Sequence, residues 1–278
     1  MQRLQRLAPH RLAASTPLPD VLGLAAKFPG AHFRRGQTSL IAAEPNNGKS
    51  PLVRWMCVQW ALQGLRVLYF SADSDEFTTW KSVAACVSGK ETSYVAKGGS
   101  APRDVQASLR RLEGRMAFVF ETDPSYDDIQ QECAAFWELW GSYPDVIVVD
   151  LLSDVQGDNE DEYAVLREHT RAFKRIARVT GAHVVMINHV NEEAHKSSDE
   201  IVPPPRARIT GKISKKPELV ITLAYDKYVR HMKIAVVKGR DVEGGVDTSG
   251  REYLTLKSDP ERMQFHDPNT GQRLGVAA

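Results

Sequence analysis

Hydrophobic residues in the first two thirds of the chain follow two kinds of pattern. Short uninterrupted apolar runs occupy residues 38–42, 66–70, 117–120, 145–149 and 184–187. Between them lie longer stretches whose apolar side chains recur every three or four residues, at 50–63, 77–87, 125–140 and 163–177. The first kind is typical of strands buried on both faces, and the second predicts amphipathic helices. The alternation predicts an α/β fold with a mostly parallel central sheet flanked by helices.

The last third of the chain has a different pattern. Residues 191–217 are polar, contain three consecutive prolines at 203–205 and show no periodicity, so they predict a long loop. Four strand-like runs follow without helices between them, at 219–225, 232–237, 252–256 and 263–265. This pattern predicts C-terminal antiparallel strands added to the edge of the parallel sheet.

Composition narrows the class of protein. The chain has 278 residues, of which 42% are hydrophobic, and this suffices for one large α/β domain. We expect a basic, proline-punctuated arm over residues 1–30 and one ATPase domain over residues 31–278. The three scattered cysteines argue against a disulfide framework, and no apolar run has the roughly 18 residues of a membrane helix. We therefore expect a soluble protein of the cell interior without a membrane partner.

A phosphate-binding loop is the strongest chemical signal. Residues 43–50 read A-E-P-N-N-G-K-S and lie between a predicted strand and a predicted helix, which is the context that this motif requires. Backbone N–H groups there would hold phosphate oxygens, Lys49 would reach the β- and γ-phosphates of ATP, and Ser50 would bind Mg²⁺. The residues expected to bind the nucleotide are Ala43, Glu44, Pro45, Asn46, Asn47, Gly48, Lys49 and Ser50.

Two acidic side chains at strand ends are candidates for the chemistry of hydrolysis. Asp150 ends the fourth apolar run, where a carboxylate can bind Mg²⁺ together with Ser50, although it could also cap a turn. Asp73 follows the second run and is the candidate for polarising the attacking water. Asp75 and Glu76 are close enough to take that role, and any of the three acids could instead cap a helix.

The phosphate loop also carries a resemblance to a known family. Its A-x-P-x-x-G-K-S form resembles the RecA-like motor domain at the C-terminal end of DnaB-like replicative helicases. Residues 67–73, 146–152, 184–190 and 208–213 are similar, in order and spacing, to further motifs of that family. The resemblance covers residues 16–265. The family has glutamate at the position of Asp73 and usually glutamine at that of His189, so both are departures.

The resemblance implies how the protein assembles. ATP would lie between adjacent subunits of a ring, most simply a hexamer. Lys238 and Arg240 are similar to a K-x-R hairpin whose two cations enter the ATP site of the neighbouring subunit. Arg240 would stabilise transition-state charge there, and His189 would lie near the γ-phosphate. The alternatives are a basic surface turn for the pair and an ordinary packed histidine for His189.

A single-stranded DNA partner is the remaining expectation from the resemblance. The formal net charge is only +1, so contact with DNA must come from a local patch. The predicted loop after the fifth strand supplies such a patch, although a basic run is often just a solvated face. The candidate nucleic-acid contacts are Lys196, Arg206, Arg208, Lys212, Lys215 and Lys216.

Three functions therefore remain open. The first is a DnaB-like helicase of a bacterial or phage-infected cell, without the primase-recruiting domain of the family. The second is a RecA-like recombination ATPase that forms filaments on single-stranded DNA. The third is an assembly ATPase regulated by a protein partner, and the near-neutral charge and the acidic loop at 156–162 keep this alternative open.

Overall fold

The uninterrupted apolar runs form the parallel part of one sheet. The computed structural model describes residues 16–97, 101–157, 161–191 and 200–275. Its parallel strands are β1 (Thr38–Ala43), β2 (Val67–Ser71), β3 (Met116–Val119), β4 (Val146–Asp150), β5 (His183–His189) and β6 (Leu219–Asp226). All residues of β1, β2 and β4 are buried, as expected for strands that are covered on both faces.

Three further strands extend this sheet on one side. They are β7 (His231–Gly239), β8 (Leu254–Asp259) and β9 (Gln264–His266), and each pairs antiparallel with the strand before it. Within the described residues the strand order is β3-β2-β4-β5-β1-β6-β7-β8-β9. The predicted fold, a mostly parallel sheet followed by antiparallel strands, is confirmed.

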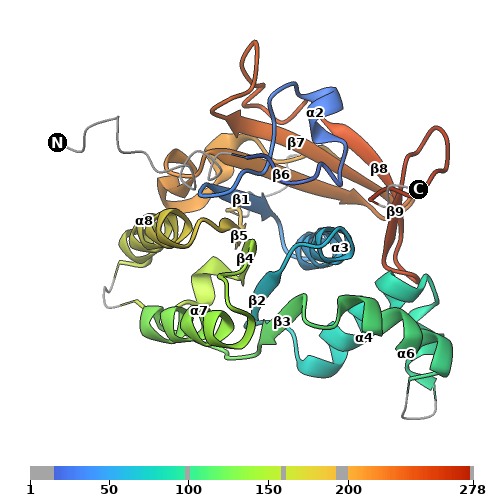
Figure 1. Ribbon diagram of the computed structural model, residues 1–278. Helices are drawn as coiled ribbons and strands as arrows, with labels where there is room; N and C mark the ends of the chain where they lie inside the picture. Colours follow the sequence, from blue (N-terminus) through green and yellow to red (C-terminus); the bar gives the residue numbers. More distant parts are fainter. Residues whose placement is uncertain (1–15, 98–100, 158–160, 192–199, 276–278) are drawn as a thin grey trace.

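The amphipathic stretches form helices on both faces of the sheet. Figure 1 shows α7 and α8 on one side and α3 on the other. Ser125 caps α7 in a capping box with Asp128. The principal helices are α3 (Lys49–Leu62), α4 (Glu76–Ser88), α7 (Tyr126–Trp140) and α8 (Glu162–Thr180).

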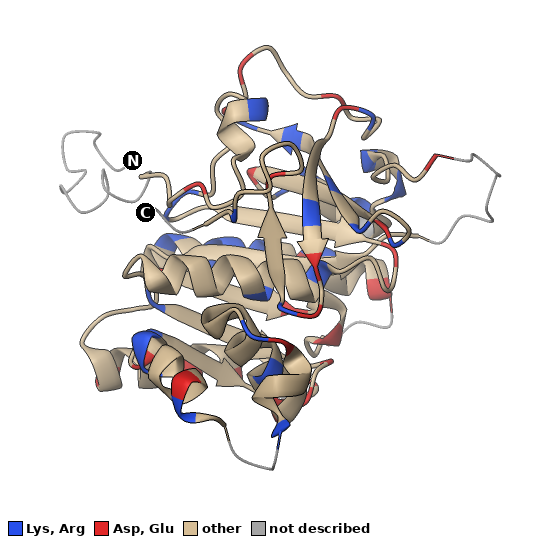
Figure 2. Ribbon diagram, turned by 90° about the vertical axis from the view of Figure 1, so that its right-hand side faces the viewer, with Lys and Arg blue, Asp and Glu red and all other residues tan. Residues whose placement is uncertain are grey.

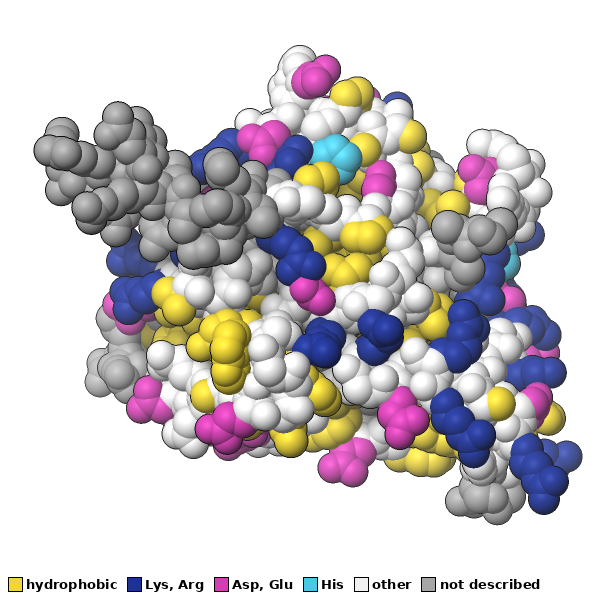
Figure 3. Space-filling view, in the orientation of Figure 1, with side chains coloured by type: hydrophobic (Ala, Val, Ile, Leu, Met, Phe, Trp, Pro, Cys, Tyr) yellow, Lys and Arg dark blue, Asp and Glu magenta, His cyan; other side chains and the backbone are white. Residues whose placement is uncertain are grey.

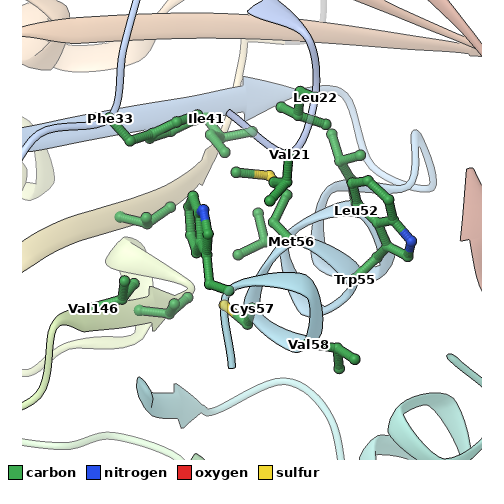
Figure 4. Close-up of a cluster of buried hydrophobic side chains, with 14 of the residues drawn as sticks. Val21, Leu22, Phe33, Ile41, Leu52, Trp55, Met56, Cys57, Val58 and Val146 are labelled. Carbon is green, nitrogen blue, oxygen red and sulfur yellow. The ribbon is translucent and has the colours of Figure 1, made fainter. Parts of the chain in front are cut away.

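Helix α3 is enclosed by the protein and forms the centre of one hydrophobic cluster. Trp55, Met56 and Trp60 are almost fully buried, and the segment before β1 covers part of the helix. Figure 4 shows Val21 and Leu22 of that segment close to side chains of α3. Helix α2 (Leu24–Lys27) belongs to the same segment. The larger apolar side chains of residues 16–30 therefore pack in the domain core, and the rest of the expected arm, residues 1–15, lies outside the described residues.

Several short helices have no clear signal in the sequence. Between α4 and β3 the chain forms α5 (Thr92–Val95), α6 (Arg103–Leu109) and η3 (Arg110–Leu112). The predicted long loop after β5 contains η5 (Arg206–Arg208) and η6 (Thr210–Lys215). Among the described helices, none combines the length and the apolar character needed to cross a membrane.

Candidate active site

The phosphate loop joins β1 to α3 and leaves backbone donors available. Asn46 and Gly48 have φ angles of 60° and 72°, in the left-handed region, so the loop curls around the start of the helix. No side chain caps the first turn of α3. The unpaired N–H groups of a helix start carry partial positive charge and are suited to phosphate oxygens. The loop therefore has the backbone geometry expected of a nucleotide site.

Lys49 lies where this loop meets the end of β5. Its Nζ donates to the carbonyl oxygens of Ala43 and Glu44, at 3.2 and 2.9 Å, and lies 3.0 Å from Nδ1 of His189. The sheet register explains the last contact, because Ala43 pairs with His189. Burial lowers the pKa of Lys49 to about 8, and the carboxylates of Asp150 and Asp73 oppose this effect. The structure thus brings Lys49 and His189 together.

A hydroxyl and a carboxylate meet beside the lysine. Ser50 Oγ donates to Asp150 Oδ1 at 3.0 Å, and Tyr69 Oη donates to Asp150 Oδ2 at 2.6 Å. Burial raises the pKa of Asp150, while the hydrogen bonds from Tyr69 and Ser50 lower it.

Oxygen ligands of this kind suit Mg²⁺, which usually takes one or two protein ligands together with substrate phosphates. In the described ranges no group of three or more His, Cys, Asp or Glu side chains could hold a metal ion. Ser50 and Asp150 therefore fit a magnesium ion that is shared with a nucleotide and do not form a closed protein site.

The acids after β2 have different environments. Asp75 is the N-cap of α4 and accepts a hydrogen bond from Thr78 N at 2.9 Å, which lowers its pKa. Asp73 is exposed and lines a cavity of about 480 Å³ together with Lys49, Ser50 and His189. The helix-cap alternative therefore applies to Asp75, and Asp73 is the acid that faces the phosphate loop.

Two residues of this site were not identified from the sequence. Tyr69 is fully buried in β2, where its hydroxyl needs a polar partner and finds Asp150. Arg54 is 6% exposed, lines the same cavity and donates from Nη1 to Thr79 Oγ1 at 3.2 Å. A tyrosine within a buried strand and an arginine within a buried helix are the signals that could have identified them.

Lys238 and Arg240 lie near the amino end of β1, whereas the phosphate loop follows its carboxyl end. Gly239 pairs with Leu219, and Leu219 pairs with Ser39 near the start of β1. The phosphate loop follows the opposite end of β1, roughly 16 Å away at about 3.3 Å per residue. These two cations therefore do not reach the phosphate loop of their own chain.

A buried glutamate holds this second group of charges together. Glu218 accepts hydrogen bonds from N and Oγ1 of Thr38, both at 3.1 Å, and from Lys174. Arg240 Nη1 lies 3.7 Å from the same carboxylate, and the arginine side chain is 61% exposed. Burial and the nearby Arg206 lower the pKa of Lys238 to about 8. The exposed guanidinium of Arg240 is thus held at the surface, where another molecule can reach it.

The candidate nucleic-acid residues differ in exposure. Lys212, Lys215 and Lys216 are exposed, whereas Arg206 and Arg208 are partly buried. Lys196 lies outside the described residues. Over the rest of the molecule basic and acidic side chains are interspersed, as Figures 2 and 3 show, in agreement with the net charge of +1. The segment after β5 therefore remains the predicted site of contact with a nucleic acid.

Sequence relatives are phage proteins. The chain is 32% identical over 267 residues to the Gene 65 protein of Mycobacterium phage L5, covering 92% of this chain and 95% of that protein. It is 30% identical over 238 residues to the Gene 65 protein of Mycobacterium phage D29, covering 82% and 98%.

Solved structures with a similar fold include an ATPase domain and a helicase. The separately solved ATPase domain matches with a TM-score of 0.72 at 14% identity, over 83% of this chain and 84% of that chain. A DnaB-like replicative helicase matches with a TM-score of 0.76 at 14% identity, over 90% and 63%. A KaiC-like protein from Pyrococcus horikoshii OT3 matches with a TM-score of 0.60 at 14% identity, over 89% and 97%.

Residues 27–195, more than half of the chain, match the protein family described as the AAA domain. They include the phosphate loop, Asp73, Asp150 and His189. The chain therefore belongs to the AAA-domain family, and it has the RecA-like fold of the DnaB-like helicase ATPase domains.

Proposed function

We propose that this protein is an ATP-driven motor that moves along single-stranded DNA, a helicase or translocase built as a ring of identical subunits. One observation carries the proposal. The phosphate loop and the exposed Arg240 lie at opposite ends of β1, which supports a site that Arg240 of a neighbouring subunit completes. The DnaB-like helicase and the separately solved ATPase domain have the same fold, which agrees with this function.

Within one subunit the phosphate loop binds the nucleotide. The donors at the start of α3 and the ammonium of Lys49 hold the phosphates, and the contact with His189 orients Lys49. Ser50 and Asp150 would hold Mg²⁺, which would neutralise charge on the phosphates. Asp73 faces the same cavity and accepts the proton of the attacking water.

The neighbouring subunit completes the reaction. Its Arg240 reaches the phosphates and stabilises the charge that develops in the transition state, and its Lys238 lies beside that arginine. Glu218 holds Arg240 at the end of β7, and Lys238 Nζ donates to the carbonyl oxygens of Ser214 and Lys215 beside it. A ring closes these heterologous contacts, and a hexamer is the form that we propose.

Single-stranded DNA binds to the protein through contacts with its phosphate groups. Lys212, Lys215 and Lys216 are exposed on the segment after β5 and supply positive charge without aromatic side chains. Such a surface follows the DNA backbone and does not read the sequence. Because both sequence relatives are phage proteins, we place this activity in the cytoplasm of a phage-infected bacterium.

A partner-regulated ATPase is the second candidate. The intermingled surface charges and the net charge of +1 favour it over a filament-forming recombinase, which would cover a long stretch of polyanion. In that case ATP hydrolysis would not respond to DNA.

Steady-state ATP hydrolysis with and without single-stranded DNA tests the proposal. We expect the native protein to be stimulated by the strand in a salt-dependent manner and to displace an annealed oligonucleotide. Lys49→Ala is expected to lose both activities. ATP hydrolysis that is indifferent to DNA at low salt would contradict the motor and favour the partner-regulated enzyme.

A further inference from the structure

A salt bridge ties the phosphate loop to the segment after β5. Glu44, the second residue of the phosphate loop, lies with its Oε1 2.8 Å from Nη2 of Arg208. The Arg208 side chain is 15% exposed and that of Glu44 is 31% exposed, so the pair is largely withdrawn from water. Arg208 is therefore placed differently from Lys212, Lys215 and Lys216, which are exposed.

The same arginine contacts the first residue of this segment. Arg208 Nε donates to the carbonyl oxygen of Asn191 at 3.2 Å, and Asn191 N donates back to the carbonyl oxygen of Arg208 at 3.0 Å. Val190 and Ile209 form an antiparallel bridge beside them, and Thr210 Oγ1 donates to Asn191 Oδ1. The start of the segment is thus fastened to residues 208–210 within it.

These contacts form a closed chain that returns to the lysine of the phosphate loop. Glu44 accepts from Lys49 Nζ through its carbonyl oxygen at 2.9 Å, while its carboxylate holds Arg208. Lys49 in turn contacts His189, which lies two residues before Asn191. A displacement of Arg208 consequently affects Lys49 by two routes, through Glu44 and through Asn191 and His189.

The charge of Glu44 explains why this link affects nucleotide binding. A carboxylate within a phosphate loop repels a polyphosphate unless a cation offsets its charge. Arg208 supplies that cation from the segment that carries the exposed lysines. We propose that Arg208 is a positioning residue which couples strand binding to nucleotide binding through Glu44. This inference rests on the proposed function, because it requires that the protein binds a strand.

Thermodynamic linkage measures the coupling. The probe is a fluorescein-labelled oligothymidylate, titrated with the native protein in the absence and in the presence of saturating magnesium and a non-hydrolysable ATP analogue. We expect the two strand affinities to differ by about fivefold or more, the usual range of allosteric coupling. We expect the ratio of the two affinities to approach one in Glu44→Gln, in Arg208→Gln and in the double variant. The double variant should match the single variants, because the same salt bridge is broken in all three.

Arg206→Gln and Lys212→Gln are the matched controls. Arg206 contacts Ser214 Oγ at 3.3 Å, and Lys212 is exposed. Each control should lower the affinity for the oligothymidylate by the same factor with and without the ATP analogue. The ratio of the two affinities should therefore stay as in the native protein. If the Glu44 and Arg208 variants keep the affinity ratio of the native protein, the inference is wrong, but the proposed motor is not affected. A native protein that does not bind the strand would overturn both the inference and the proposed motor.

Discussion

At the scale of single residues, the site depends on side chains that hold the ligand-binding groups in place. Asp150 is buried, and burial by itself raises its pKa and weakens its charged form. The hydroxyl groups of Tyr69 and Ser50 oppose this effect by donating hydrogen bonds to the carboxylate. The second of these partners, Ser50, would share the magnesium ion, whereas Tyr69 only supports Asp150.

Replacing Tyr69 with phenylalanine tests this support. The ring and its packing against Phe118 remain, but the 2.6 Å hydrogen bond to Asp150 is lost. Because a hydrogen bond to a charged group contributes about 1.5–3 kcal/mol, we expect the magnesium concentration for half-maximal ATP hydrolysis to rise roughly tenfold. Tyr94→Phe is the control, since Tyr94 donates at 3.3 Å to Asp104 on the surface. An unchanged magnesium requirement in Tyr69→Phe would show that the hydroxyl is dispensable.

The two acids after β2 give a second prediction at this scale. Asp73→Asn should lower kcat by about 100-fold or more, the range of general base catalysis, and leave nucleotide affinity nearly unchanged. Asp75→Asn should retain activity, because asparagine caps a helix as well as aspartate does. The measurement is kcat together with the affinity for a fluorescent ATP analogue. Loss of turnover in Asp75→Asn but not in Asp73→Asn would reverse the assignment.

At the scale of elements, local sequence patterns predicted most of the fold. The strands β1, β2, β4 and β5 are uninterrupted apolar runs, and the phosphate loop requires a strand before it and a helix after it. The short helices α5 and α6 lack such a pattern, because a helix of one or two turns has too few residues for a periodicity. The sequence predicts an arm over residues 1–30, because the apolar side chains of residues 16–30 show no periodicity that would indicate packing on α3.

The contacts that could not be predicted join distant parts of the chain. Glu218 meets Thr38 across 180 positions, and Tyr225 N meets Asn47 across 178 positions. Such pairs follow from sheet order, which the sequence does not specify uniquely. The phosphate loop, Asp73, Asp150 and His189 lie together because each of them is at the carboxyl end of a parallel strand. This part of the site was therefore predictable.

A histidine in β5 predicts a pH dependence of stability. His183 accepts from Ser39 Oγ at 2.9 Å and donates to the carbonyl oxygen of Arg34 at 2.7 Å, and burial lowers its pKa from 6.5 to about 4. Because the unfolded chain binds the proton more readily, the free energy of unfolding should fall as the pH decreases from about 6.5 to about 4. A pKa difference of this size corresponds to about 3 kcal/mol.

Urea denaturation at several pH values measures this effect. Burial also lowers the pKa values of His169 and His189, which contribute with the same sign. His183→Gln should therefore reduce the slope of stability against pH without removing it. A slope that is identical in the native protein and in this variant would exclude His183 as the main source.

The turn after β7 gives a further prediction about an element. Gly30 has a φ angle of +87°, and a Cβ atom there would lie 1.9 Å from the carbonyl oxygen of Asp241, next to Arg240. Gly30→Ala should displace this turn and destabilise the protein more than Gly181→Ala does. At Gly181 (φ +77°) a Cβ meets nothing within 4 Å, so only the left-handed strain of about 1–2 kcal/mol remains. Thermal denaturation compares the two, and equal melting temperatures would contradict the close packing at Gly30.

At the scale of the whole molecule, the sheet divides the functional groups between two ends. The nucleotide groups lie at the carboxyl end of β1, and Arg240 and Lys238 lie near its amino end. In the ring that we propose, each subunit would contribute one half of an ATP site at each of these two ends. In such a ring, hydrolysis in one subunit would depend on the position of the next subunit.

Mixing two inactive variants is the most direct test of this arrangement. Lys49→Ala removes the phosphate-loop cation and keeps Arg240, whereas Arg240→Ala does the reverse. We expect each variant alone to be inactive. An equal mixture should recover hydrolysis, since random assembly pairs a native Lys49 with a neighbour's native Arg240 at roughly one quarter of the interfaces. Full activity of Arg240→Ala alone, or no recovery on mixing, would contradict an ATP site shared between subunits.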